Sequence, residues 1–171
     1  MKIGFLAAAA LAGAITAGCV VRTPATVAFS AEEAAFIKKG GTGVITGHAF
    51  RTKPSGAVVN AAGQVVTLVP ATAFARERFT NLYGGGKYVP HHAYPLPDEV
   101  DPAYAEYSRT TKAESNGRFV FDNVAPGTYF VTTQVLWGDE YAFSREGGLV
   151  YDSVTLTGKE TRPVDVILSG N

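Results

Sequence analysis

The sequence has little cysteine, little net charge and few recognisable motifs of catalysis. Cys19 is the only cysteine among 171 residues, so no disulfide can form within the chain and packing alone must hold the fold. The 15 basic residues equal the 15 acidic ones in number, and no basic block stands out. A nearly neutral chain of this kind is not expected to bind nucleic acid.

Motifs that bind phosphate or perform nucleophilic catalysis are also missing. No serine lies in a Gly-x-Ser-x-Gly motif. The segment Gly84–Lys87 (GGGK) lacks the GxxxxGK[ST] form, so we interpret it as a flexible turn. The acidic residues Asp98, Glu99 and Asp101 lack calcium-loop spacing and predict a solvated loop, with weak divalent binding as the alternative. We therefore predict neither an enzyme nor a bound cofactor.

The chain contains three histidines, His48, His91 and His92. Three histidines can hold a zinc ion and leave one coordination position open. Side chains of adjacent residues on an extended chain, however, point to opposite sides, so His91 and His92 cannot easily share an ion. We predict surface or loop histidines and no metal site, with a metal-dependent enzyme as the less favoured alternative.

The N-terminus has the features of a secretory signal. Lys2 precedes an apolar run from Ile3 to Ile15, and small residues follow. A charged start, about 7–15 apolar residues and then small residues are typical of a cleaved signal peptide. A spanning helix needs about 20 apolar residues, so an anchor that is never cut is the weaker alternative.

The single cysteine lies where this apolar run ends. The stretch Ile15-Thr16-Ala17-Gly18-Cys19 (ITAGC) resembles the lipobox of bacterial lipoproteins, in which a peptidase cuts before the cysteine and lipid is attached to it. Two or more acyl chains anchor a protein stably, whereas one holds it marginally. The resemblance implies a signal peptide over residues 1–18 and a lipid anchor at Cys19, the alternative being a buried free thiol. Because Val20 is not Asp, it also implies the outer membrane if the source is Gram-negative.

Residues 19–42 read as a lipidated tether that ends in a short helix. Ser30 and Glu33 have the spacing of a capping box, lysines close the segment, and Gly40-Gly41 ends it. The pattern predicts a helix from about Ala31 to Lys39.

From Gly43 onward the pattern becomes that of β-strands. Short segments rich in Val, Ile, Phe, Tyr and Thr alternate with Gly, Pro and Asn, which is typical of strands and turns. We predict one all-β domain over residues 43–171, an antiparallel Ig-like sandwich of about seven strands. Thr128–Trp137 is apolar on both faces and should form its central strand.

Four segments resemble a known domain family in their order and pattern: Gly43–Gly47 (GVITG), Gly63–Pro70 (GQVVTLVP), Asn116–Phe121 (NGRFVF) and Val124–Tyr129 (VAPGTY). They are similar to the carboxypeptidase regulatory-like domain, and the similarity extends over about residues 43–168. The resemblance implies a transthyretin-like (prealbumin-like) β-sandwich in which Phe119 and Phe121 face the core. It also implies a non-catalytic domain, because in the namesake enzymes this domain accompanies a separate catalytic one.

Residues 71–107 form an insertion where a typical member of that family has a shorter connection. Ala71–Phe79 predicts a helix, and from Gly84 to Tyr107 the strand pattern disappears. Long irregular insertions in compact domains are usually functional or disordered. We predict that the insertion carries a binding surface, to which Trp137 could add; the alternative is that its rings bury themselves over a sheet edge. The candidate residues are Tyr83, Tyr88, His91, His92, Tyr94, Tyr104 and Tyr107.

Together these features predict a non-catalytic lipoprotein of the bacterial cell envelope that acts as a binding or structural accessory module. Its expected contacts are the membrane, through Cys19, and either an envelope protein or a glycan. Docking on a larger envelope assembly is the first hypothesis and glycan binding the second, for which exposed coplanar tyrosines would be needed.

Overall fold

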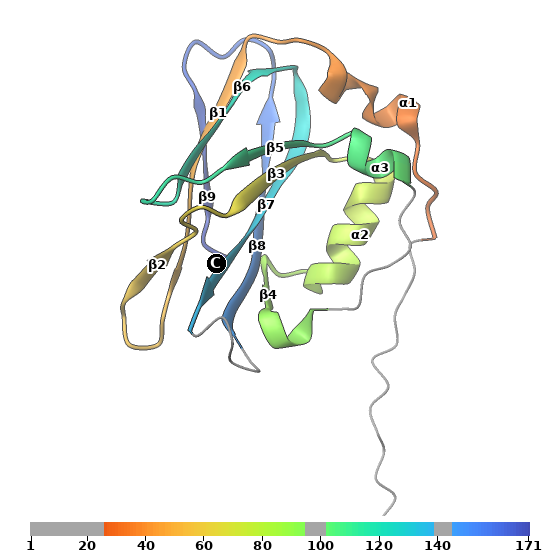
Figure 1. The fold of residues 1–171 in the computed structure, drawn as a ribbon. Helices are drawn as coiled ribbons and strands as arrows, with labels where there is room; N and C mark the ends of the chain where they lie inside the picture. Colours follow the sequence, from red (N-terminus) through yellow and green to blue (C-terminus); the bar gives the residue numbers. More distant parts are fainter. Residues whose placement is uncertain (1–25, 95–101, 139–144) are drawn as a thin grey trace, which may run out of the picture.

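In the computed structural model, which describes residues 26–94, 102–138 and 145–171, two sheets pack face to face with short helices on one side (Figure 1). The predicted all-β sandwich is confirmed, and Cys19 and Asp98, Glu99 and Asp101 lie outside the described residues. The elements in chain order are α1 (Ala31–Ala34), η1 (Ala35–Lys38), β1 (Gly43–Thr52), β2 (Val58–Asn60), β3 (Val65–Pro70), α2 (Ala73–Tyr83), β4 (Tyr88–Pro90), η2 (His91–Ala93), α3 (Pro102–Glu106), β5 (Arg109–Lys112), β6 (Arg118–Val124), β7 (Gly127–Trp137), β8 (Glu146–Leu156) and β9 (Val164–Leu168).

The first sheet, called the β1 sheet below, is built around strand β1. That strand pairs antiparallel with β2 and β6 and parallel with β9. Its sequence alternates buried and partly exposed residues from Gly43 to Phe50, as a strand with one face on a core must. Gly47 faces inward, and a Cβ there would lie 2.3 Å from the Phe119 ring, so only glycine leaves room for that ring.

The second sheet, called the β7 sheet below, has the strand order β4-β8-β7-β3-β5. Strand β7 is central, as its apolar character on both faces predicts. It pairs antiparallel with β8 along its whole length, from Gly127↔Leu156 to Trp137↔Glu146. The prediction from the residues of Thr128–Trp137 is confirmed.

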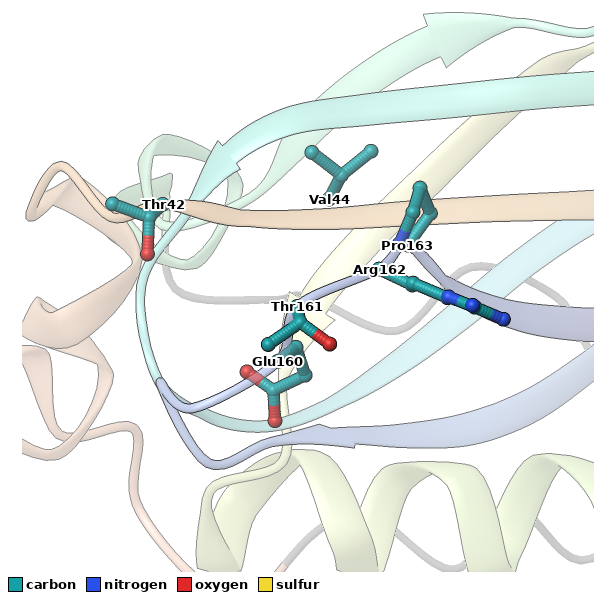
Figure 2. Close-up of a pocket in the computed structure, with 6 residues that line it drawn as sticks. All are labelled: Thr42, Val44, Glu160, Thr161, Arg162 and Pro163. Carbon is teal, nitrogen blue, oxygen red and sulfur yellow. The ribbon is translucent and has the colours of Figure 1, made fainter.

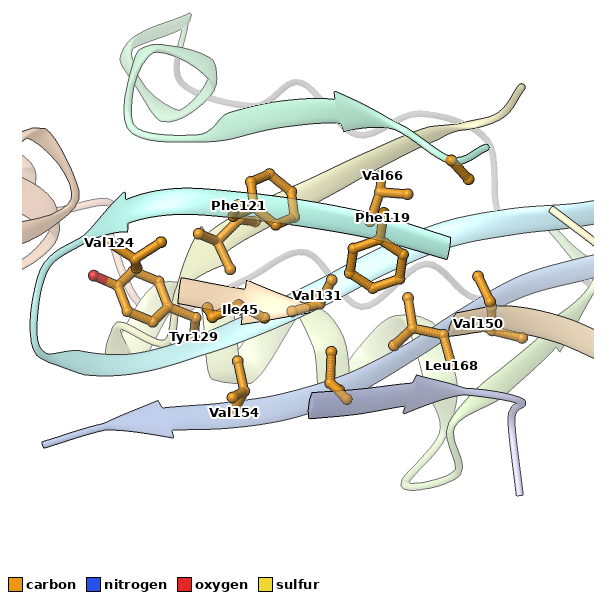
Figure 3. Packing of buried hydrophobic residues seen from close by; sticks show 14 of the residues in the cluster. Ile45, Val66, Phe119, Phe121, Val124, Tyr129, Val131, Val150, Val154 and Leu168 are labelled. Atoms are coloured by element: carbon orange, nitrogen blue, oxygen red, sulfur yellow. The ribbon is translucent and has the colours of Figure 1, made fainter. Parts of the chain in front are cut away.

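The core lies between the two sheets and draws its side chains from both (Figure 3). Phe119 and Phe121 are almost fully buried there, as predicted. Tyr129 is also completely buried, and its hydroxyl donates to the Ala125 carbonyl at 2.8 Å. Burial raises the pKa of Tyr129 to about 12, so this ring stays neutral and serves the core.

The outer face of the β7 sheet carries a second apolar cluster, which helix α2 covers. Thr72 caps the helix by accepting a hydrogen bond from the Ala75 amide at 3.2 Å, and Gly84 ends it in a left-handed conformation. The helix predicted over residues 71–79 is therefore confirmed and runs to Tyr83. The buried members of the cluster are Val69, Ala71, Ala75, Phe79, Tyr83, Val89 and Phe130.

Part of the segment from Gly84 to Tyr107 forms a strand, although the strand pattern of the sequence disappears there. Strand β4 adds to the edge of the sheet beside β8, with Tyr88 opposite Val150. An edge position tolerates Pro90, whose missing N–H would interrupt an inner strand. Strand β5 is short and polar (RTTK) and occupies the opposite edge, so neither strand has the apolar alternation that identifies the inner ones.

The N-terminal helix forms where the sequence predicts it, as one α-helical turn followed by one 3-10 turn. Ser30 accepts from the Glu33 amide at 3.2 Å, which is one half of the expected capping box. The other half is absent, because the Glu33 carboxylate instead accepts from the Ala73 amide at 2.8 Å. This acidic side chain therefore links the N-terminal segment to the start of α2.

Candidate functional site

The tyrosines of the insertion do not form one platform. Tyr83 is 5% exposed and belongs to the apolar cluster under α2, so its assignment to a binding surface is wrong. Its ring lies 4.2 Å from that of Tyr151, and its hydroxyl is 2.9 Å from the Thr132 hydroxyl. Burial raises the pKa of Tyr83, which keeps the group neutral.

Tyr104 and Tyr107 belong to a separate group of rings at the end of the insertion. Both pack against Phe29, with ring centroids 5.7 and 5.6 Å away, and Tyr104 also meets Phe74 at 5.2 Å. Burial raises the pKa of Tyr104. These rings hold the N-terminal segment against the insertion. Their packing favours the alternative in which the rings bury themselves, and not a binding platform that they would form together.

The remaining candidates of the insertion lie near the start of strand β8. The Tyr88 hydroxyl donates to the Gly147 carbonyl at 3.0 Å, and the Arg51 guanidinium lies 4.0 Å from the centre of its ring. His91 stacks on Tyr94 with centroids 4.8 Å apart, and His92 is exposed. The Tyr94 hydroxyl is buried and has no hydrogen-bond partner among the described residues, and burial raises its pKa to about 12.

The outer face of the β1 sheet is the other large surface of the sandwich, and no described element packs across it (Figure 1). Val120 and Ile167, on the strands that flank β1, are 42% and 45% exposed. Side chains alternate along a strand, so the residues between the buried ones of β1 share this face with them. We call this surface the open face; its residues are Val44, Thr46, His48, Phe50, Asn60, Arg118, Val120, Asp165 and Ile167.

Strand pairing arranges the open face in rows. Thr46 lies opposite both Val120 and Asp165, and its hydroxyl donates to the Asp165 carboxylate at 3.1 Å. In the next row His48 lies opposite Arg118 and Ile167. Each row thus places a polar or charged group next to an apolar one.

Two aromatic rings lie in the middle of this face. His48 and Phe50 are two residues apart on β1, with ring centroids 4.8 Å apart and an angle of 38° between their planes. The His48 Nε2 atom is 3.1 Å from the Asn60 Oδ1 atom, which fixes the imidazole beside the amide. The arrangement offers an aromatic surface bordered by an amide and a guanidinium, which suits a ligand with both apolar C–H groups and hydroxyls.

A small pocket adjoins the open face at the start of β1 and β9 (Figure 2). Its volume is about 130 Å³ and Val44, a member of the open face, forms part of its wall. Glu160 accepts from the Thr157 hydroxyl and amide and from the Gly158 amide, and these bonds lower the pKa of Glu160 to about 2. The full lining is Thr42, Val44, Glu160, Thr161, Arg162 and Pro163.

Within the described ranges, no three side chains of His, Cys, Asp or Glu come together in a way that could hold a metal ion. His48 lies on the open face, whereas His91 and His92 lie in η2 beside β8. In the same part of the chain, none of the helices has the length and apolar character that crossing a bilayer requires.

The sequence predicted His48 as a surface or loop histidine, but it did not identify the face that carries His48 as a binding surface. The alternation in GVITGHAF already placed Val44, Thr46, His48 and Phe50 on one side of a strand. What the sequence could not show is that Asp165 and Ile167, more than a hundred residues away, pair beside them. Nor could it show that the insertion covers the opposite sheet.

Comparison with known proteins shows a likeness to a solved structure. No protein-family model matches the chain, and no curated protein matches it. A solved structure from Pseudomonas aeruginosa, described as that of a "putative carbohydrate binding protein", superposes with a TM-score of 0.68 and 29% sequence identity. The likeness covers 82% of this chain and 97% of the other, so the two proteins are similar over most of the fold.

Proposed function

We propose that this chain is a lipid-anchored, non-catalytic module of the bacterial cell envelope that binds carbohydrate on its open face. The proposal joins the fold, the chemistry of one surface and the description of a similar protein. Among the described residues, the open face is the broad surface that no other element covers.

The observation that carries the proposal is the ring pair of His48 and Phe50 with its polar border. The C–H faces of a sugar ring pack well on aromatic rings, and its hydroxyls need both donors and acceptors. Asn60 supplies an amide that can do both, Arg118 donates and Asp165 accepts. Opposite charges on the face favour a neutral ligand, because no single sign of charge dominates.

The similar protein from Pseudomonas aeruginosa supports the same class of ligand, since it is described as a "putative carbohydrate binding protein". Envelope anchoring rests on the lipobox-like stretch that ends at Cys19. Membership of the carboxypeptidase regulatory-like family and a transthyretin-like strand arrangement remain part of the proposal. They rest on the four sequence segments that resemble that family.

Docking of an envelope protein on the insertion is less well supported than glycan binding on the open face. Among the candidate residues, the Tyr83 ring packs on Tyr151, and the Tyr104 and Tyr107 rings pack on Phe29. They therefore have partners within the chain. Glycan binding is the second hypothesis from the sequence. We place it on the open face and not on the insertion, where the sequence predicts the binding surface.

The test is a glycan microarray of bacterial envelope and plant oligosaccharides, followed by calorimetric titration of the strongest glycan. Phe50→Ala on the open face and Tyr107→Ala on the insertion are matched variants, since each removes a half-exposed ring. We expect Phe50→Ala to weaken binding about tenfold, roughly 1.4 kcal/mol, and Tyr107→Ala to leave it unchanged. The reverse result would return the site to the insertion, and a wild type that binds no glycan would contradict the proposal.

A further inference from the structure

We propose that the insertion seats the N-terminal segment and makes the α2 side of the domain the side nearest the membrane, so that the open face is turned away from the lipid. This inference rests on the proposed lipid anchor at Cys19. The proposed carbohydrate site does not include the insertion, and this inference gives the insertion a role.

The first attachment of the segment is a carboxylate on α2. Glu77 accepts from the Thr26 amide at 2.9 Å, the Thr26 hydroxyl at 2.8 Å and the Val27 amide at 2.8 Å. These hydrogen bonds lower the pKa of Glu77. Three bonds from residues some fifty positions away in sequence fix the chain at its first described residue.

Two further attachments follow along the chain. The Phe29 ring lies between Phe74 of α2 and the tyrosines Tyr104 and Tyr107, with centroid distances of 5.8, 5.7 and 5.6 Å. Glu33 then accepts from the Ala73 amide, which is otherwise an unpaired donor at the start of α2. The segment is thus held by polar and aromatic contacts at three points, all on the insertion.

This attachment shortens the free tether. Cys19 and Thr26 are seven residues apart, and seven residues span at most about 25 Å. If the segment were free, the tether would run to Gly43, the start of β1, and would span at most about 85 Å. A long tether would permit every orientation of the domain, whereas the short one keeps α2 near the lipid.

The geometry of the sandwich then places the open face on the far side. Helix α2 lies on one side of the β7 sheet and the β1 sheet lies on the other (Figure 1). A helix packs about 10 Å from a neighbouring layer, and stacked sheets lie about 10 Å apart. The open face is therefore about 20 Å further from the membrane than α2.

The experiment measures the distance of two surface positions from the bilayer in the lipidated full-length protein. Thr80→Cys on α2 and Val120→Cys on the open face each place a fluorophore at an exposed residue. Mass spectrometry first establishes that Cys19 carries lipid and is not labelled. The protein is then held in phosphatidylethanolamine/phosphatidylglycerol vesicles that contain a headgroup-linked quencher.

We expect the label at position 80 to be quenched at least about twofold more than the label at position 120, given a separation of about 20 Å. In a variant that combines Phe29→Ala, Glu33→Ala and Glu77→Ala, all three attachments are removed and the two labels should be quenched alike. Equal quenching in the otherwise unaltered lipidated protein would overturn this inference and leave carbohydrate binding untouched. Absence of lipid at Cys19 would instead refute the proposed anchor.

Discussion

The two outer faces of the sandwich are built from similar alternating strands but have different neighbours. On the β7 sheet, Phe130 and Tyr151 point outward and are covered by Phe79 of α2, with ring centroids 4.5 and 4.9 Å away. On the β1 sheet, Phe50, Val120 and Ile167 point outward and no described element covers them. The chain uses its insertion to bury one face, which suggests that the other is left open for a ligand.

The largest difference between the faces should emerge when one ring is removed from each. Phe79→Ala takes a buried ring from between α2 and the β7 sheet and should lower the free energy of unfolding by about 3–5 kcal/mol. Phe50→Ala removes a half-exposed ring and should cost about 1 kcal/mol or less. Urea unfolding followed by circular dichroism measures both values. Equal losses would show that the open face is covered in solution.

Substitutions at two neighbouring residues of β1 should have different effects, one on the stability of the fold and the other on glycan binding. Gly47 faces the core, and a Cβ there would meet the Phe119 ring and the Val166 carbonyl oxygen at 2.3 and 2.6 Å. We expect Gly47→Ala to lower stability by about 1–3 kcal/mol because the core cannot accept the extra methyl group. His48→Ala should instead weaken glycan binding and change stability little. Thermal unfolding and calorimetric titration of both variants test this; a His48→Ala protein that binds normally would contradict the role of the imidazole.

A smaller effect should follow from one hydroxyl beneath α2. Tyr83→Phe removes the hydrogen bond to the Thr132 hydroxyl, which still donates to the Val150 carbonyl at 3.1 Å. Because no donor is stranded, the loss of stability should be about 0.5–1.5 kcal/mol. Tyr107→Phe is the control on a half-exposed ring and should change stability less. Glycan affinity should be the same in both variants, and a weaker affinity in Tyr83→Phe would show that the two faces are coupled.

The smallest effects should come from two carboxylates, one beside each face. Hydrogen bonds lower the pKa of Glu77 and that of Glu160, the latter to about 2 from the ordinary 4.5. Each therefore contributes stability above about pH 4.5, and that contribution is lost as the pH falls through the lowered pKa. For Glu160 the loss lies between pH 4.5 and about 2.

The pH dependence can be assigned with two variants. Glu160→Gln should flatten the acid limb of stability, measured by urea unfolding between pH 2 and 5. Glu77→Gln should flatten it too and should also speed hydrogen exchange at Thr26 and Val27, whose amides this carboxylate holds. If exchange at those amides did not change, the N-terminal segment would not depend on Glu77.

The sequence predicted the parts of the fold that depend on local pattern. Alternation identified β1 and β6, apolar residues on both faces identified β7, glycine and proline placed the turns, and Ser30 marked the first helix. Strands β4 and β5 escaped recognition because their stability comes from pairing at a sheet edge and not from an apolar pattern.

The candidate site was harder to predict, because it depends on contacts between distant parts of the chain. The aromatic residues of 71–107 suggested a binding surface. The residue type alone, however, does not show whether a ring such as Tyr83 is buried or exposed. Only the three-dimensional arrangement shows that the Phe79 ring packs on Phe130 and that no described element covers the face with His48 and Phe50. Position on a face, and not residue type, distinguishes the two regions.

The most direct test of carbohydrate binding on the open face is to map a bound glycan by NMR, with amide shifts recorded as the strongest microarray glycan is added. We expect the largest shifts at Thr46, His48, Phe50, Val120 and Ile167, in the rows of the open face. Residues of α2 should shift little. Shifts confined to residues 71–94 and 102–107 would contradict binding on the open face, because they would place the ligand on the face that the insertion covers.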